Sequence, residues 1–223
     1  EELAPQDVRF GVQSNLWLLT DELCDLFREY NVAIGTSLDG PETINDAQRG
    51  EGYFHRTMAG IDHARSDGLN VGCICTFTAQ SARQADEVFD FFLGEGLAFS
   101  VHAATPPLGG TGDGWALPPE AHGQLLVDLL DRYLDHAQEI RIPTLDAVCR
   151  SISSQRGTMC TFGDCLGEYL AVDPQGWIVP CQRFAGLGGY QVGNVHDHPT
   201  LDDLSTAPFW RALEQRQERI EES

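Results

Sequence analysis

The chain has 223 residues, of which 42% are apolar and 22% charged, and this composition predicts a folded protein with a sizeable hydrophobic core. Its 34 acidic and 14 basic residues give a formal net charge of −20, which argues against nucleic acid as a partner. No apolar run approaches the roughly 20 residues of a membrane-spanning helix, and the first residues do not resemble a secretory signal. We therefore expect a cytoplasmic protein that does not enter a membrane.

The first hundred residues alternate short β-rich runs with helical patterns, which predicts βα units around a parallel sheet or barrel. The pattern predicts strands at residues 8–13, 32–38, 70–78 and 97–103, and helices at residues 20–30, 54–68 and 82–93. Thr20 stands where an N-terminal cap of the first helix is needed. Between the second strand and the second helix we expect a polar loop.

The second half of the chain changes character near residue 157. Residues 105–119 contain four Pro and four Gly and predict a long loop, and helical patterns follow around residues 125–133 and 145–153. Clustered Cys and Gly then replace the βα pattern, so we predict two domains, residues 1–156 and 157–223. The second domain is expected to contain a β-hairpin at residues 169–180, turning at Pro174-Gln175-Gly176, and one terminal helix at residues 201–220.

Three of the seven cysteines, Cys160, Cys165 and Cys181, flank the predicted hairpin. An odd number of cysteines without an export signal argues against a disulfide framework. A hairpin brings its two ends together, so thiolates at those ends converge on one metal site. Thiolate ligands suit an iron–sulfur cluster or zinc.

The spacing Cys165, ten residues, Gly176, four residues, Cys181 resembles the opening of the SPASM domain of radical S-adenosylmethionine (radical SAM) maturases. The resemblance implies that Cys160, Cys165 and Cys181 are three of the four ligands of an auxiliary 4Fe–4S cluster. It also implies an electron donor such as ferredoxin or flavodoxin. The alternative from the residues alone is a set of structural thiols or a zinc ribbon.

A second similarity to the same family lies in the first half, where Ser37-Leu38-Asp39-Gly40-Pro41 is followed by Arg49. The resemblance implies that Ser37 and Arg49 bind the carboxylate of S-adenosylmethionine, with Asn15 near the cofactor. A hydroxyl and a guanidinium at the carboxyl end of a barrel strand suit a carboxylate ligand. The alternative is an ordinary turn and a surface arginine.

The resemblance implies an α/β fold, a partial (β/α) TIM-like barrel followed by an incomplete, Cys-rich SPASM domain. The implied activity is that of a maturase whose 5′-deoxyadenosyl radical abstracts hydrogen from a ribosomally made peptide or protein. The initiating Cys-x3-Cys-x2-Cys run is absent. We therefore expect a chain that begins after the first two βα units, stops inside the cluster domain, and is inactive by itself.

Gln182 follows Cys181, where sulfatase-maturating members have a catalytic Asp, and a neutral amide cannot act as a carboxylate base. Another peptide-modifying maturase is therefore the preferred function, and anaerobic sulfatase maturation the second. The catalytic base stays unassigned, because Asp164 and Glu168 are expected to be solvated loop carboxylates. Rival hypotheses are a non-catalytic, zinc-stabilised binding module and a metal-free barrel enzyme acting on a small anionic metabolite.

Overall fold

The computed structural model describes residues 8–112, 114–159 and 165–221 and divides the protein into two compact units. Unit 1 is Glu1–Cys149 and unit 2 is Arg150–Ser223. The division falls inside helix α6 (Pro143–Ser154), shortly before the boundary predicted at residue 157. No helix in the described part of the chain combines the length and hydropathy of a bilayer-crossing segment.

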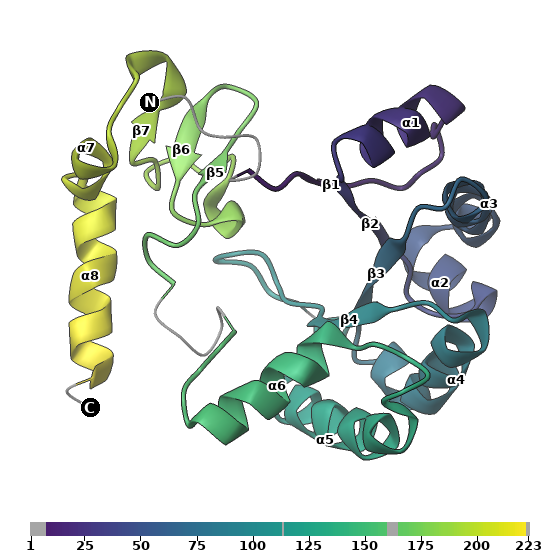
Figure 1. Ribbon diagram of the computed structural model, residues 1–223. Helices are drawn as coiled ribbons and strands as arrows, with labels where there is room; N and C mark the ends of the chain where they lie inside the picture. Colours follow the sequence, from purple (N-terminus) through teal and green to yellow (C-terminus); the bar gives the residue numbers. More distant parts are fainter. Residues whose placement is uncertain (1–7, 113, 160–164, 222–223) are drawn as a thin grey trace. The chain divides into compact units, whose positions relative to one another are not determined.

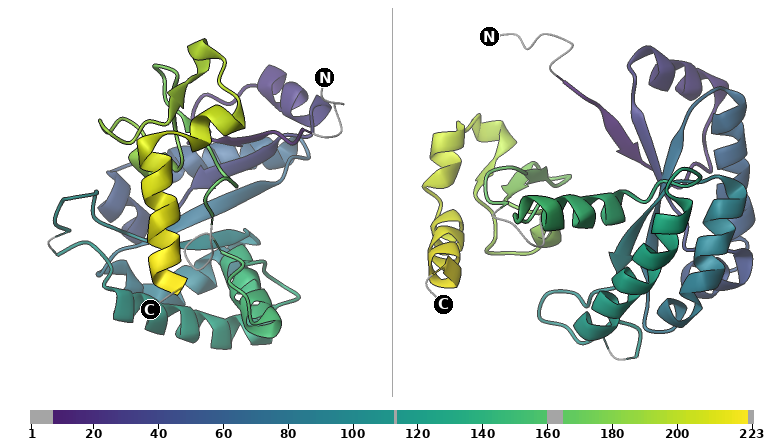
Figure 2. Two further views of the ribbon diagram at one scale, coloured as in Figure 1. Left: turned by 90° about the vertical axis from the view of Figure 1, so that its left-hand side faces the viewer. Right: turned by 60° about the horizontal axis from the view of Figure 1, so that its bottom comes forward.

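Unit 1 is built on a four-stranded parallel sheet in the order β1-β2-β3-β4. The predicted strands are all present, and each is shorter than its sequence pattern. In chain order they are β1 (Gly11–Gln13), β2 (Ala33–Ser37), β3 (Val71–Phe77) and β4 (Phe99–Ala103). Figures 1 and 2 show helices α1 to α4 gathered along one face of this sheet.

The helices of unit 1 begin and end close to the predicted positions. Thr20 caps α1, because its hydroxyl accepts a hydrogen bond from the Leu23 amide at 3.3 Å. Gly68, with φ of 75°, follows the end of α3 in a left-handed conformation. The three predicted helices are α1 (Asp21–Glu29), α3 (Tyr53–Ser66) and, after a 3-10 turn at Ser81–Gln84, α4 (Ala85–Glu95).

The polar loop predicted between residues 38 and 54 is wrong, because Glu42–Arg49 forms helix α2. This helix has one large apolar residue, Ile44, so the sequence lacks the repeated large apolar side chains by which a core-facing helix is identified. Burial of Ile44 and Asn45 anchors it: the Asn45 side chain accepts a hydrogen bond from the Asp39 amide at 3.1 Å. Tertiary contacts, rather than local pattern, make this segment helical.

After β4, a segment without regular structure leads to two helices, α5 (Pro119–His136) and α6 (Pro143–Ser154). The start of α6 covers the edge of the sheet. The Thr144 hydroxyl accepts from the Val101 amide at 2.9 Å, and the Phe99 amide donates to the Arg141 carbonyl at 3.2 Å. These contacts satisfy backbone groups of β4 that an open edge would leave unpaired.

Unit 2 contains a three-stranded antiparallel sheet, β5 (Ala171–Val172), β6 (Trp177–Val179) and β7 (Gly193–Asn194), in that order. The predicted hairpin is confirmed as β5 and β6. Gly176 has φ of 82°, and its amide donates to the Asp173 carbonyl at 2.9 Å. A glycine suits this turn because other residues rarely adopt such a conformation.

The single terminal helix predicted at residues 201–220 is wrong, because the structure has two helices, α7 (Leu201–Ser205) and α8 (Pro208–Glu221). Proline has no backbone donor and disfavours a helical conformation in the residue before it, so the chain breaks ahead of Pro208. Thr200 and Asp203 start α7 with a reciprocal capping box. Figure 2 shows α8 in yellow as a separate rod.

Candidate functional site

The strands of unit 1 have two chemically different faces. Side chains alternate across a strand, so every second residue shares a face. The residues under the helices are buried and mostly apolar, whereas those between them are partly buried or exposed and, apart from Ile74, small or polar. The second set comprises Gly35 and Ser37 of β2, Gly72, Ile74 and Thr76 of β3, and Ser100 and His102 of β4.

Ser37 is the last residue of β2, at the carboxyl edge of the sheet, in register with Ile74 of β3. Its side chain is half-buried, and its hydroxyl forms no hydrogen bond with the part of the chain that the structure describes. The hydroxyl therefore retains its donor and acceptor for a ligand on this face. The carboxyl edge of a parallel sheet is where α/β proteins place their ligands.

Arg49, at the end of α2, is held by the buried carboxylate of Asp39. Arg49 Nη2 donates to Asp39 Oδ1 at 2.8 Å, and Nε lies 2.7 Å from Oδ2. Asp39 has 2% of its surface exposed. Burial alone lowers the pKa of the Arg49 guanidinium, but the hydrogen bond and charge of Asp39 outweigh burial and raise that pKa. Arg49 is thus a permanent cation in a fixed orientation.

Two further groups secure the carboxylate of Asp39. The Thr76 amide donates to Asp39 Oδ1 at 2.8 Å, and the Gln48 amide nitrogen donates to Oδ2 at 2.8 Å. Gln48 also donates to the Thr76 carbonyl at 3.0 Å and accepts from the Thr78 hydroxyl at 3.0 Å. Because a buried charge is costly without such partners, this network explains how Asp39 is retained in the interior.

Asp46 connects α2 to α3. Its carboxylate accepts from the Gly52 amide at 2.6 Å and from the Phe54 amide at 2.8 Å, and Asn45 donates to it at 3.1 Å. Desolvation opposes these bonds, but the backbone and Asn45 donors outweigh it and lower the pKa of Asp46. The first turn of α3 is therefore pinned to the helix that carries Arg49.

Asn15 lies outside this network. Its side-chain oxygen accepts from the Trp17 amide at 3.2 Å, which closes a local turn, and the residue is exposed. The side chain of Gln13, two residues earlier, packs directly against Gly35. A Cβ atom at position 35 would lie only 2.1 Å from Gln13 Oε1, so this position leaves no room for a side chain unless Gln13 moves. The structure therefore assigns Asn15 a turn, and its proximity to the cofactor stays a prediction.

Two features of this site were missed by sequence reasoning. That reasoning assigned Asp39 no role of its own within the Ser37–Arg49 segment, although a charged residue directly after the apolar Leu38 is a signal for an internal ion pair. His102 lies on the same face as Ser37, and partial desolvation lowers the pKa of its imidazole. The available signal for His102 was the alternation of the strand Phe99–Ala103, in which the polar Ser100 and His102 stand between apolar residues.

In unit 2, the hairpin is followed directly by Cys181, and Cys165 precedes it. Both thiols are half-buried. Cys160 and Asp164 lie outside the described residues, so the convergence of the three sulfurs stays a prediction. Glu168 is exposed, as expected for a solvated carboxylate.

The cysteines of β3 have a different environment. Burial raises the pKa of Cys73 to about 12 and raises that of Cys75 well above its usual value. Both thiols lie in the core beneath the helices. Among the described residues, neither lies in a group of side chains that could hold a metal ion, so both act as small apolar residues of the core.

No model of a known protein family matches the sequence. An uncharacterized protein of Methanothermobacter thermautotrophicus is 49% identical over 149 residues, which cover 66% of this chain and 57% of that protein. The serine-type anaerobic sulfatase-maturating enzyme of Bacteroides thetaiotaomicron is 22% identical over 213 residues, which cover 86% of this chain and 51% of the enzyme. The chain thus spans little more than half the length of these relatives.

Two solved structures share the fold. Native anSMEcpe with bound AdoMet and Cp18Cys peptide matches 92% of this chain and 59% of its own, with a TM-score of 0.79 and 20% identity. Streptococcus suis SuiB bound to S-adenosylmethionine matches 92% of this chain and 50% of its own, with a TM-score of 0.69 and 16% identity. The predicted α/β fold class and the resemblance to radical SAM/SPASM proteins are confirmed.

Proposed function

We propose that this chain, which has the fold of the radical SAM/SPASM maturases, forms the cofactor-binding and cluster-binding part of an enzyme that modifies a ribosomally made peptide or protein. The observation that carries the proposal is the pairing of Arg49 with buried Asp39, close in sequence to Ser37, whose hydroxyl forms no hydrogen bond with the described residues. Similarity to sulfatase-maturating enzymes, and to neighbours solved with AdoMet and with peptide, supports it.

The residues present suit S-adenosylmethionine. Ser37 and Arg49 are proposed to bind its methionyl carboxylate, because a hydroxyl and a guanidinium together offer short, charge-assisted hydrogen bonds. Asp39 is a positioning residue, since it fixes the guanidinium through two contacts. Asn15 is proposed to lie near the cofactor. When bound with a reduced cluster, S-adenosylmethionine supplies the 5′-deoxyadenosyl radical that abstracts hydrogen from substrate.

Cys160, Cys165 and Cys181 are proposed to hold an auxiliary 4Fe–4S cluster in unit 2. The half-burial of Cys165 and Cys181, one before and one after the hairpin, supports this, because solvent exposure and neighbouring hydrogen bonds tune the potential of such a cluster. Ferredoxin or flavodoxin is the proposed electron donor. The printed sequence has no Cys-x3-Cys-x2-Cys run, so we propose that this chain alone binds its cofactors without starting the radical reaction.

Titration of the chain with S-adenosylmethionine tests the assignment of Arg49. We expect Arg49→Gln to weaken binding about 10- to 100-fold, since hydrogen bonds to charged groups contribute about 1.5–3 kcal/mol. Ser37→Ala should weaken it about tenfold. Arg141→Gln, which changes the same charge at a side chain with 77% exposure, is the matched control.

Removing Arg49 alone leaves the Asp39 carboxylate buried without its cation, which destabilises the fold. The double variant Asp39→Asn, Arg49→Gln removes both charges and keeps the test valid. Equal affinity of this folded double variant and the unaltered chain would refute the assignment. A loss of affinity with an unchanged circular dichroism spectrum would support it.

Sulfatase maturation is the second candidate, favoured by the similarity to the Bacteroides thetaiotaomicron enzyme. Against it stands Gln182, an exposed amide at the position after Cys181. Incubation of a complete enzyme containing this region with a sulfatase peptide, followed by mass analysis of the peptide, decides between sulfatase maturation and another peptide modification. Formation of formylglycine would replace our first candidate with the second.

The non-catalytic alternative is a binding module in which the three cysteines hold zinc. Anaerobic reconstitution with iron and sulfide separates the two hypotheses. A brown protein containing iron and sulfide, lost in Cys165→Ala and Cys181→Ala, supports the cluster. A colourless protein that retains one zinc ion contradicts it.

A further inference from the structure

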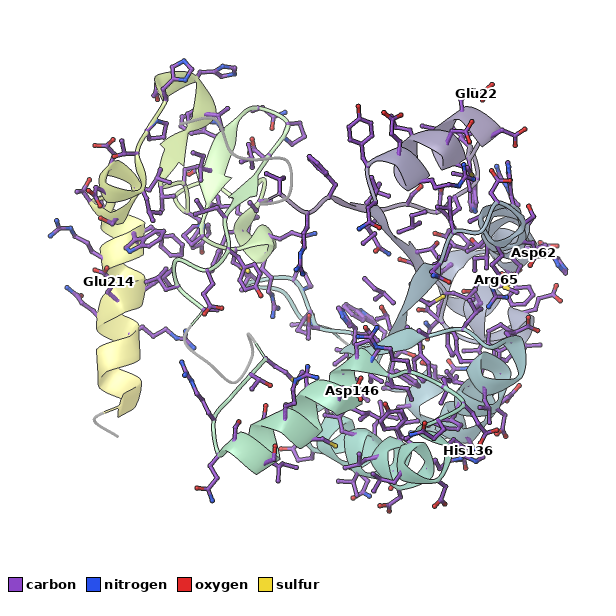
Figure 3. The ribbon with its side chains drawn as sticks, viewed as in Figure 1. Glu22, Asp62, Arg65, His136, Asp146 and Glu214 are labelled. Carbon is purple, nitrogen blue, oxygen red and sulfur yellow. The ribbon has the colours of Figure 1, made fainter. Side chains whose placement is uncertain are left out.

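Three metal-ligating side chains meet on the helical side of unit 1, away from the carboxyl edge that carries Ser37. Cys24 belongs to α1, His63 to the last turn of α3, and Asp67 caps the end of α3. One sulfur, one ring nitrogen and one carboxylate oxygen from these residues lie within 4.8 Å of one another. In Figure 3 the labelled Glu22 marks α1, and Asp62 and Arg65 mark α3.

The helices make this arrangement geometrically consistent. His63 and Asp67 are four residues apart, so their side chains share one face of the helix end. Cys24 has no exposed surface, whereas His63 and Asp67 expose about a third of theirs, 32% and 28%. A metal ion could therefore enter from solvent on the side of His63 and Asp67, and meet the buried sulfur last.

Asp21 supports the histidine. Its carboxylate lies 2.8 Å from Nε2 of His63, and the residue precedes Cys24 by one helical turn. A carboxylate contact of this kind orients a ligating imidazole and increases its basicity. Asp21 is 85% exposed, so in the absence of a metal an ion pair with His63 contributes little stability.

The charges around the cluster favour a cation. Burial, followed by the charge and hydrogen bond of Asp67, raises the pKa of the Cys24 thiol. Arg28 is the neighbouring cation. It pairs with the Asp25 carboxylate at 2.7 Å, donates to the Asp67 carbonyl at 2.8 Å and lies 3.5 Å from the Asp67 carboxylate, which a metal ion would compete for. Asp25 and Asp67 contact the Arg28 guanidinium and Asp21 contacts His63, so three carboxylates and one guanidinium surround the cluster and the local charge is negative.

We propose that Cys24, His63 and Asp67 bind one Zn²⁺ ion, with water as the fourth ligand and Asp21 orienting His63. Sulfur with nitrogen favours zinc over calcium or magnesium, which prefer oxygen alone. Bond lengths of about 2.0–2.3 Å require tetrahedral ligand separations of roughly 3.3–3.8 Å. The three atoms lie within 4.8 Å of one another, so they need to approach by at most about 1–1.5 Å. Binding releases the thiol proton of Cys24 to solvent.

The bound ion would join α1 to α3 across the outer layer of unit 1. This role does not depend on the proposed radical chemistry, because the three ligands lie on helices rather than at the carboxyl edge of the sheet. Its expected effect is stabilisation of the folded chain. An excess of zinc about a hundredfold above its Kd should raise Tm by roughly 5–10 °C.

Co²⁺ and Zn²⁺ titrations test the site in a full chain carrying Cys160→Ala, Cys165→Ala and Cys181→Ala, which removes the proposed cluster ligands. We expect one Co²⁺ per chain with a sulfur-to-cobalt charge-transfer band, displaced by Zn²⁺. Cys24→Ser in that background should abolish the band, and His63→Gln should weaken binding by at least about tenfold. Cys149→Ser is the matched control and should change neither result.

Cys24 is fully buried, so a polar replacement there risks unfolding α1. If Cys24→Ser does not fold, the test rests on His63→Gln, which changes a partly exposed side chain. If the triple variant binds no Co²⁺, the proposal is overturned. It is equally overturned if the charge-transfer band persists in a folded Cys24→Ser chain, or if folded His63→Gln binds with unchanged affinity. The radical SAM assignment would stand in each case, since it rests on other residues.

Discussion

The two units differ in what holds their functional residues in place. Unit 1 has a large continuous core that draws on β2 to β4 and on its helices. The core described in unit 2 consists of Ile178, Val192, Leu204 and Trp210, with a few partly buried neighbours. Apolar burial grows with the size of a core, so unit 1 is able to organise its site without a ligand, whereas unit 2 has far less to stabilise it.

The difference indicates two ways of preparing a binding site. In unit 1 the Asp39–Arg49 pair is completed by backbone and side-chain donors from neighbouring elements. In unit 2 the proposed ligands flank a hairpin whose strands contain two and three residues. Small domains of this kind commonly depend on a metal for stability. We therefore expect the cluster to organise unit 2, and the protein fold to organise unit 1.

The largest expected effect comes from removing the cluster ligands. The double variant Cys165→Ala, Cys181→Ala lacks two of the proposed cluster ligands. We expect a protease to cleave its unit 2 about tenfold or more faster than that of the unaltered protein reconstituted with iron and sulfide, because metal-binding energy contributes to folding. Limited proteolysis with identification of the fragments measures this. Unit 1 should survive as a resistant fragment.

Cys149→Ala is the control for that experiment, because it removes a thiol that is not a proposed ligand. Its cleavage pattern should match that of the reconstituted protein. If unit 2 is cleaved equally fast with and without iron and sulfide, the contrast between the two units is wrong.

The second effect tests the core of unit 1. Phe92 of α4 is fully buried and stacks on Phe99 of β4, with ring centroids 4.3 Å apart. Phe92→Ala should lower the free energy of unfolding by about 3–5 kcal/mol, through lost burial and the cavity left behind. Urea unfolding followed by circular dichroism measures it, and Leu134→Ala, at a side chain 63% exposed, should change stability by less than about 0.5 kcal/mol.

The smallest effect concerns Asp46, which links α2 to α3. Asp46→Asn should lower the free energy of unfolding by about 1–2 kcal/mol at pH 7, because charged hydrogen bonds to the Gly52 and Phe54 amides are lost at a partly exposed site. The folded pKa lies below the unfolded value of 3.8, so this stabilisation is fully present above that pH.

The difference between Asp46→Asn and the unaltered chain should therefore shrink as the pH falls through the folded pKa of Asp46. Unfolding curves at pH 7, 5 and 3 test the sign. A constant difference at all three values contradicts the assigned role. Asp62→Asn, at an exposed carboxylate on α3, is the control and should change the free energy of unfolding at pH 7 by less than about 0.5 kcal/mol.

Much of the fold follows from local sequence signals. The alternation of β-rich and helical runs predicted every strand of unit 1, and the Pro174-Gln175-Gly176 turn predicted the hairpin of unit 2. These signals are local because strand pattern, capping and turn chemistry depend on neighbouring residues. Helix α2 escaped prediction because one buried isoleucine and a buried asparagine, rather than a periodic stripe, hold it in place.

The functional residues also divide into those that local sequence signals identified and those whose contacts depend on the fold. Spacing identified Ser37, Arg49 and the cysteines near the hairpin as candidates. It could not show that Asp39 holds Arg49, because their contact joins a strand end to a helix missing from the prediction. Nor could it show that Cys24 meets His63 and Asp67, which lie about forty residues further along the chain.

The sequence by itself determined the order of the elements, the alternating chemistry of the strands and the types of ligand available, since all of these depend on residues close together in the chain. Only the tertiary structure decided that α2 forms, that Asp39 is buried against Arg49, and that α1 and α3 bring together a thiol, an imidazole and a carboxylate. The physical reason is that burial and charge pairing depend on distances in space, which are set by the packing of the whole unit.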